Sequence, residues 1–248
     1  VSSFPIATGT YYKMDYSAGV DISNYKNIKV PTSYMAVNSK YDFEGGYEND
    51  TQGGMLHVAS HHFSPGKKQW TWGNGDFGQA WDRNLTDEDG PYIELMTGMF
   101  CDNQPDFTWL KPHEEKTFTQ YFMPYKGVGR VGNATKEAAV SLVEDNGTVT
   151  LKVYATGEYA GASIRAVQDG KVLLETAADL SPVGCLSFLL EGCTEAKGCS
   201  VTVKTAAGST LVAYDVYEPE LMPIPKPADP LPTPDKLKSM EELYLAAT

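Results

Sequence analysis

The sequence has little positive charge. It contains 20 Lys and Arg against 32 Asp and Glu, and its net charge at pH 7 is -12. Because a phosphate backbone is itself anionic, this balance argues against nucleic acid and against an anionic membrane surface as partners. No apolar run approaches the roughly 20 residues that a membrane-spanning helix needs. We therefore expect neither a nucleic acid nor a membrane partner.

Cysteine is also scarce, and the motifs of several enzyme classes are missing. The four cysteines form no C-x-x-C pair, which argues against a structural zinc site. Cys193 and Cys199 are spaced to close a short oxidised loop, but free thiols and a cytoplasmic location fit such sparse usage better. The sequence contains no G-x-S-x-G elbow, phosphate loop or dinucleotide fingerprint. We expect no metal and no cofactor.

The pattern of apolar residues predicts an all-β chain. Short runs rich in Tyr, Phe, Val and Ile alternate with Gly, Asn, Asp and Pro, as in strands joined by turns. We expect a first β-sandwich domain over 1–135 and a small immunoglobulin-like β-sandwich over 136–218. In the second domain, turns such as Asn146-Gly147 and Asp169-Gly170 connect seven short strands. A proline-rich linker over 219–234 and the start of a helical segment over 235–248 complete the prediction.

Both ends of the sequence are abrupt. Val1 is not a methionine, and KLKSMEELYLAAT resembles the beginning of a helix, with Ser239 and Glu242 spaced as in a capping box. We therefore expect this chain to be a piece of a longer protein.

All four tryptophans fall between Trp70 and Trp109. Indole faces stack on the C–H faces of sugar rings, although a tryptophan is also readily explained by core packing, since its burial removes roughly 200 Å² from water. Residues two apart on a strand share a face, so Trp70 and Trp72 lie on one side of the predicted strand. At least one tryptophan is expected in a binding cleft.

Three histidines, His57, His61 and His62, lie on one predicted strand, MLHVASHHF. Their spacing is too wide for a tight metal site, so His61 is either a proton-transferring or sugar-binding group near neutral pH or a histidine satisfied by its neighbours.

Carboxylates are abundant in the same region. Glu94 stands inside the apolar run YIELM, where an ionised group is costly unless it is paired or faces a polar cleft, and this makes it a candidate base or acid. Asp102 and Asp106 are either turn formers or ligands of sugar hydroxyls. The run Asp87-Glu88-Asp89 is better read as a solvated turn than as a calcium loop.

Two family resemblances rest on these residues. The text HHFSPGKKQWTWGNGDFGQAWDRNLTDEDGPYIELMTGMFCDNQPDFTWLKPHEEKTFTQYFMPY strongly resembles the uncharacterised-domain family numbered 5107, whose bacterial members continue into tetratricopeptide-type helical repeats. That resemblance covers roughly Tyr41 to Lys136 and implies no settled activity. It implies the helical-repeat region of the full-length parent as a partner.

The second resemblance is to galactose-mutarotase-like domains. These have a Glu-x-Gln strand, a Pro-Asp pair, a Leu-x-Pro-Gly-Glu turn and a Thr-rich last strand, and this order is similar to Glu94, Pro105-Asp106, LKPHE and KTFTQYF. The resemblance implies a galactose-mutarotase-like β-sandwich, here partial, with Glu94 as base and His61 as acid. Met96 replaces the Gln of the motif, so Asp102 is the alternative base.

The expected function is that of a carbohydrate-active domain that binds a sugar and hydrolyses a glycosidic bond by carboxylate chemistry. The alternatives are a non-catalytic carbohydrate- or protein-binding module and an aldose 1-epimerase-like activity. The residues expected to contact the sugar are His62, Trp70, Trp72, Trp81, Asp82, Gln104 and Asp106.

Overall fold

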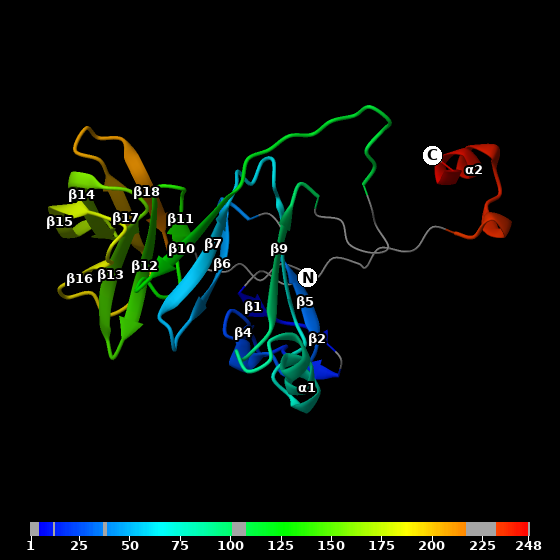
Figure 1. Cartoon of the computed structure of the whole chain (residues 1–248), viewed down its shortest axis with the longest axis horizontal. Coiled ribbons are helices and arrows are strands. Elements are labelled where there is room, and N and C mark those ends of the chain that lie inside the picture. The colour runs from blue at the N-terminus through cyan, green and yellow to red at the C-terminus, as the bar shows by residue number, and fades with distance from the viewer. Residues whose placement is uncertain (1–4, 12, 37–38, 101–107, 217–231, 248) are drawn as a thin grey trace.

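The computed structural model describes residues 5–11, 13–36, 39–100, 108–216 and 232–247. Of the residues that the structure describes, 44% lie in strands and 10% in helices, so the predicted all-β class is confirmed. Figure 1 shows the strands in two groups, joined where β10 leads into β11 and β12.

The first domain contains two three-stranded antiparallel sheets. One has the order β10-β7-β6 and consists of β6 (Phe43–Glu48), β7 (Gly53–Val58) and β10 (Tyr121–Lys126). The other has the order β5-β8-β9 and consists of β5 (Thr32–Met35), β8 (Gly66–Thr71) and β9 (Ile93–Gly98). Shorter elements complete the domain: β1 (Ile6–Ala7) paired with β4 (Val20–Asp21), β2 (Thr10–Tyr11) paired with β3 (Met14–Asp15), η1 (Tyr25–Asn27) and α1 (Asp76–Leu85).

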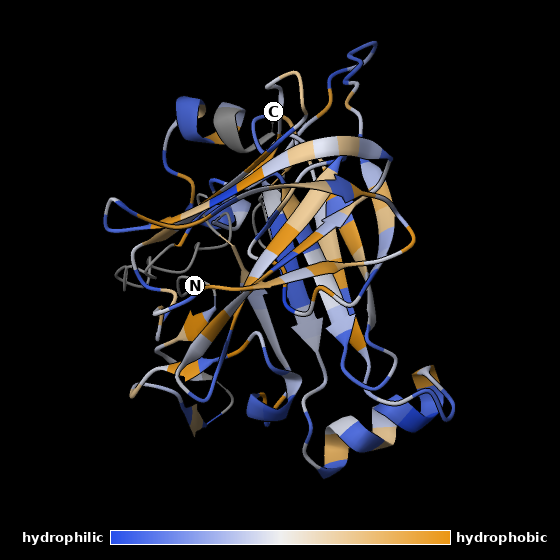
Figure 2. Cartoon of the chain, turned by 90° about the vertical axis from the view of Figure 1, so that its left-hand side faces the viewer, coloured by the Kyte–Doolittle hydropathy of each residue, from blue (hydrophilic) through white to orange (hydrophobic). Residues whose placement is uncertain are grey.

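The second domain is a sandwich of two four-stranded sheets. The first has the order β11-β12-β13-β16 and contains β11 (Asn133–Ala134), β12 (Ala138–Asp145), β13 (Thr148–Ala155) and β16 (Leu186–Leu189). The second has the order β15-β14-β17-β18 and contains β14 (Tyr159–Gln168), β15 (Lys171–Leu180), β17 (Cys199–Lys204) and β18 (Thr210–Asp215). Figure 2 shows apolar and polar residues alternating along these strands, which buries one face of each sheet.

The two domains share a packed contact. Leu56 and Met123, on one face of the β10-β7-β6 sheet, pack in one apolar cluster with Val128 and Ala139 at the start of the second domain. The opposite face of that sheet carries His57 and the residues beside it, and it is turned toward β9. The contact therefore leaves one side of the first domain's sheet for polar groups.

The structure corrects several local predictions. MLHVASHHF is not one strand, because β7 ends at Val58 and the chain then turns, with the N–H of Phe63 donating to the carbonyl of Ser60 at 3.0 Å. GTYYKMDY folds into the β2–β3 hairpin, in which Lys13 adopts a φ of 68°. Helix α1 was not predicted.

The seven strands expected in the second domain are all present as β12 to β18. Asn146 and Gly147, with φ of 49° and 74°, make one of the expected two-residue hairpin turns, and Asp169 with Gly170 makes the other.

At the C-terminal end, η2 (Pro234–Lys236) precedes α2 (Met240–Ala247). The capping box is confirmed: the Glu242 N–H donates to Ser239 Oγ at 3.0 Å, and Ser239 N–H donates to Glu242 Oε2 at 3.1 Å. Most of the predicted linker over 219–234, namely residues 219–231, lies outside the described residues. Within the part of the chain that the structure describes, no helix is long and apolar enough to cross a membrane.

Candidate functional site

Three of the four tryptophans form one aromatic cluster. Trp72 stacks on Trp81 with ring centroids 4.4 Å apart and planes 12° from parallel. Trp70 meets Trp72 edge to face at 5.2 Å, and Phe77 lies 6.0 Å from Trp72. Phe77 is 59% exposed, and the three indoles are half-buried. The expectation that Trp70 and Trp72 share one side of a strand is consistent with their contact.

Helix α1 builds the other half of this cluster. Phe77 and Trp81 are four residues apart and therefore lie on one face of the helix, which rests on Trp72. Gly78 allows this close approach, because a Cβ there would clash with the backbone carbonyls of Gly73 and Trp72. Gly75 at the N-cap and Asp76 in the first turn are the local signals that start the helix.

Glu94 belongs to the same surface. It is the direct cross-strand partner of Trp70 in the β8–β9 ladder, so the two side chains lie on one face of the sheet. The Tyr92 hydroxyl is hydrogen-bonded to Glu94, and burial followed by that carboxylate raises the pKa of Tyr92. A carboxylate beside indole faces can accept hydrogen bonds from a polyhydroxylated ligand.

Both carboxylate oxygens of Asp82 accept hydrogen bonds from other parts of the first domain. Its Oδ2 accepts a hydrogen bond from the Tyr25 hydroxyl at 2.8 Å, and its Oδ1 accepts one from the Tyr92 N–H at 3.0 Å. Burial and the Asp82 carboxylate raise the pKa of Tyr25 above its usual range. Asp82, which lies in α1, therefore connects this helix to η1 and to the start of β9.

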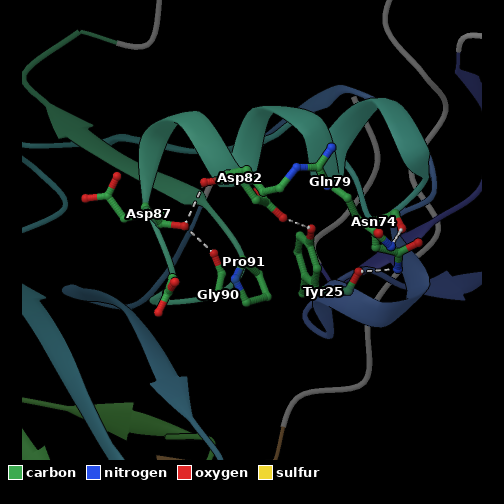
Figure 3. A pocket seen from close by; sticks show the side chains of 10 residues that line it. Tyr25, Asn74, Gln79, Asp82, Asp87, Gly90 and Pro91 are labelled. Atoms are coloured by element: carbon green, nitrogen blue, oxygen red, sulfur yellow. Dashed lines mark hydrogen bonds between the residues drawn. The ribbon is translucent and has the colours of Figure 1, made fainter.

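A shallow pocket of about 360 Å³ opens beside Asp82 on the side of α1 away from the tryptophans (Figure 3). Most of its lining residues come from α1 and from the turn after it. The lining residues are Tyr25, Asn74, Gln79, Asp82, Arg83, Thr86, Asp87, Glu88, Gly90 and Pro91.

His61 and His62 lie together in the turn after β7. Their rings are 4.0 Å apart. His61 Nδ1 lies 2.7 Å from Asp42 Oδ1, and the same oxygen accepts the His61 backbone N–H at 2.8 Å. Burial raises the pKa of Asp42, but these two hydrogen bonds outweigh it and the net pKa is lowered. Because the carboxylate is an acceptor, Nδ1 carries the ring proton, and Nε2 of the neutral ring has the lone pair.

A second cluster of polar side chains surrounds Lys67, which is 4% exposed. Its Nζ donates to Ser39 Oγ at 3.0 Å and to the carbonyl oxygen of Tyr41. Burial lowers the pKa of Lys67, while the carboxylates of Glu44 and Asp42 raise it. Burial raises the pKa of Glu44 to about 8 although Lys67 acts against this, so Glu44 is largely protonated at neutral pH.

His57 lies opposite Glu44 and is 7% exposed. Its Nε2 is 2.9 Å from Gln120 Oε1 and 3.3 Å from Thr97 Oγ1. Burial lowers the pKa of His57, which keeps the ring neutral. Sequence reasoning missed Asp42, Glu44 and Lys67 as site candidates. For Glu44 and Lys67 the sequence signal is a charged residue inside a strand, as in FEGGYE and GKKQWT, whereas Asp42 precedes its strand.

The predicted site residues thus fall into two places. Glu94 lies with the tryptophans, whereas His61 lies with Asp42 near Lys67. Lys67 and Trp70 are three residues apart on β8, about 10 Å along the strand, and they face opposite sides of the sheet. The predicted Asp102, Gln104 and Asp106 lie outside the described residues. Among the residues that the structure describes, no three His, Cys, Asp or Glu are grouped to hold a metal ion.

Comparison with known families covers both domains. Residues 9–126 match the model of a family described as a domain of unknown function, DUF5107. The first domain therefore matches this family over most of its length. The predicted resemblance to family 5107 is therefore confirmed, and the DUF5107 domain contains both groups of candidate residues described above. Residues 133–214 match the model described as YphG-like protein, second domain. No solved structure matches the chain.

Proposed function

We propose that the DUF5107 domain binds a carbohydrate on the aromatic cluster of Trp70, Trp72, Phe77 and Trp81. The observation that carries this proposal is the cross-strand pair of Trp70 and Glu94, which sets an indole and a carboxylate side by side on one face. Indole faces bind the C–H faces of a sugar ring, and the carboxylate accepts hydrogen bonds from its hydroxyl groups. The half-exposed Phe77 extends the apolar surface beyond the indoles.

The experiment is a binding screen of the full chain against neutral, amino and acidic oligosaccharides, followed by calorimetry on the ligands that bind. Trp70→Ala should lower the affinity at least about tenfold, because it removes the indole face that lies beside Glu94. Glu94→Gln should weaken binding by a smaller factor, because a neutral amide replaces a charged acceptor.

Trp109→Ala is the matched control. Trp109 is 64% exposed on the segment between β9 and β10, outside the cluster, so its loss should leave the affinity unchanged. Equal losses from the two tryptophan substitutions, or no carbohydrate bound by the unmodified chain, would overturn the proposal.

Acid–base chemistry on a carbohydrate at the separate Asp42–His61 group is the second candidate function, and the hydrogen bond between Asp42 and His61 favours it. A carboxylate that fixes the tautomer of a partly exposed histidine is an arrangement used for proton transfer. In this version the domain hydrolyses a glycosidic bond or exchanges the anomers of a free aldose. Hydrolysis needs two carboxylates about 5 Å apart for retention or about 6.5 to 9.5 Å apart for inversion.

Turnover of nitrophenyl glycosides and anomer exchange of free aldoses test this second candidate. His61→Gln should abolish turnover and spare binding. A chain that binds sugar but turns none over is the non-catalytic module.

We further propose that the domain works beside the helical-repeat region of a longer protein and in the cytoplasm, where thiols such as Cys185 stay reduced.

A further inference from the structure

Two thiols in the second domain nearly touch. Cys193 Sγ and Cys199 Sγ are 3.8 Å apart, and the two residues are 3% and 2% exposed. Cys193 Sγ also donates to the carbonyl of Glu195 at 3.1 Å. A disulfide has an S–S length of about 2.05 Å, so a modest approach of two side chains on a short loop would join them.

The pair connects the two layers of the sandwich. Cys193 follows β16 of one sheet, and Cys199 is the first residue of β17 in the other. Both belong to the apolar core between the sheets. A bond between them would therefore link the sheets covalently where the chain crosses from one to the other.

The loop between the two cysteines is held in place by side chains from other strands. Gln168 Nε2 donates to the carbonyls of Glu195 and Lys197, each at 2.9 Å. Glu144 Oε1 accepts a hydrogen bond from the Ala196 N–H. These contacts fix the backbone between the two cysteines, so the short sulfur–sulfur distance belongs to an ordered loop. In the described part of the chain, no third ligand completes a metal site around the two thiols.

We propose that Cys193 and Cys199 are a redox-active dithiol that forms an intrachain disulfide and staples the two sheets of the second domain together. The oxidant is a small-molecule disulfide. One cysteine thiolate attacks it and releases one small thiol, which leaves a mixed disulfide on the chain. The second cysteine loses its proton to solvent, attacks the protein sulfur and releases the second small thiol. Two protein thiols are oxidised by two electrons, and one small disulfide is reduced to two thiols.

The surroundings of the pair determine the conditions of this reaction. Burial raises the pKa of Cys199 to about 12, and the neighbouring Cys193 thiol, Asp169 and Glu144 act in the same direction. The attacking species is a thiolate, so oxidation is slow at neutral pH and accelerates as the pH rises or as the loop opens locally.

The test equilibrates the full chain with mixtures of reduced and oxidised glutathione, blocks free thiols under denaturing conditions and maps tryptic peptides by mass spectrometry. Trypsin cuts after Lys197, so the disulfide appears as peptides 172–197 and 198–204 linked with the loss of two hydrogens. Since Cys185 lies in the first of these peptides, the mapping is done in a Cys185→Ser chain, in which the link identifies Cys193.

The linked pair of peptides is the expected result. The thermal unfolding midpoint of the oxidised chain should exceed that of the reduced chain by at least about 4 °C. A glutathione adduct on one cysteine, a link to Cys101, or two free thiols under the most oxidising mixture would overturn the proposal. Cys193→Ser should abolish the redox-dependent shift. Because the unmodified chain is also compared with and without reductant, the test stands even if that variant folds poorly.

Discussion

Glu44 on β6 and His57 on β7 are direct cross-strand partners, and each carries a buried atom without a hydrogen-bond partner among the described residues. These atoms are Glu44 Oε1 and His57 Nδ1. His57 Nε2 lies against the side-chain amide oxygen Oε1 of Gln120, so Nε2 carries the ring proton and Nδ1 is an acceptor. A protonated Glu44 is a donor. When both side chains are neutral, Glu44 is therefore a donor and His57 Nδ1 an acceptor. Charging either side chain should lower the stability of the fold, so the dependence of stability on pH tests these protonation states.

Glu44→Gln should remove a loss of stability that occurs as the pH rises from about 4.5 to about 8. The pKa of Glu44 rises from its ordinary 4.5 to about 8 on folding, so the folded state holds the proton more tightly than the unfolded state. The free energy of unfolding should therefore fall as the pH rises from about 4.5 to about 8, by about 1 to 3 kcal/mol. Denaturant midpoints across this window measure it. A variant with the same slope as the unmodified chain would contradict the assignment.

His57→Asn should flatten the opposite slope on the acid side. Burial lowers the pKa of His57 below 6.5, so its contribution to stability is complete above that pH and is lost as the pH falls through the folded-state pKa. The slope of unfolding free energy between about pH 5 and about pH 7 is the measurement. His113→Asn is the control, because His113 is exposed and its φ of 67° suits asparagine. Equal effects of both variants would refute the prediction.

Gly78→Ala should displace α1 and disperse the aromatic cluster. The added Cβ would meet the Gly73 backbone, which is held by its own contact with β8, so the helix must move away from Trp72. We expect a loss of about 2 to 4 kcal/mol and a weaker near-ultraviolet circular dichroism signal from the Trp72–Trp81 stack. Gln79→Ala, one residue further on the exposed side of α1, should leave the signal intact.

Tyr25→Phe should loosen the junction of η1, α1 and β9 without changing its shape. The substitution removes the hydroxyl that lies 2.8 Å from Asp82 Oδ2 and 2.9 Å from the Gly73 carbonyl oxygen, and the carboxylate keeps the hydrogen bond from the Tyr92 N–H. A loss of about 1 to 2 kcal/mol in the free energy of unfolding is expected for one hydrogen bond to a charged group. Urea titration measures it. If Tyr25→Phe left the free energy of unfolding unchanged, the hydrogen bond from Tyr25 would not be what holds Asp82 in place, and the Asp82 carboxylate would be available to bind a ligand.

The second domain was predictable because its strands carry local signals. Alternating runs such as TVTLKVYA and glycine turns at Asn146 and Asp169 define both the strands and their hairpins. The first domain was harder. The turn after β7 forms because Asp42, nineteen residues earlier, accepts two hydrogen bonds from His61, and no local pattern shows this. Helix α1 was missed since its sequence, DFGQAWDRNL, contains a glycine in a close contact rather than a helix former.

The sequence by itself determined the all-β class, the family of the first domain and the clustering of tryptophan with acid, because strand periodicity and residue type are local properties. Only the tertiary structure decided which polar groups meet. It placed Glu94 beside Trp70 and committed Asp82 to Tyr25. It also buried Glu44 and His57 together, since strand register and the facing of sheets depend on contacts between distant segments.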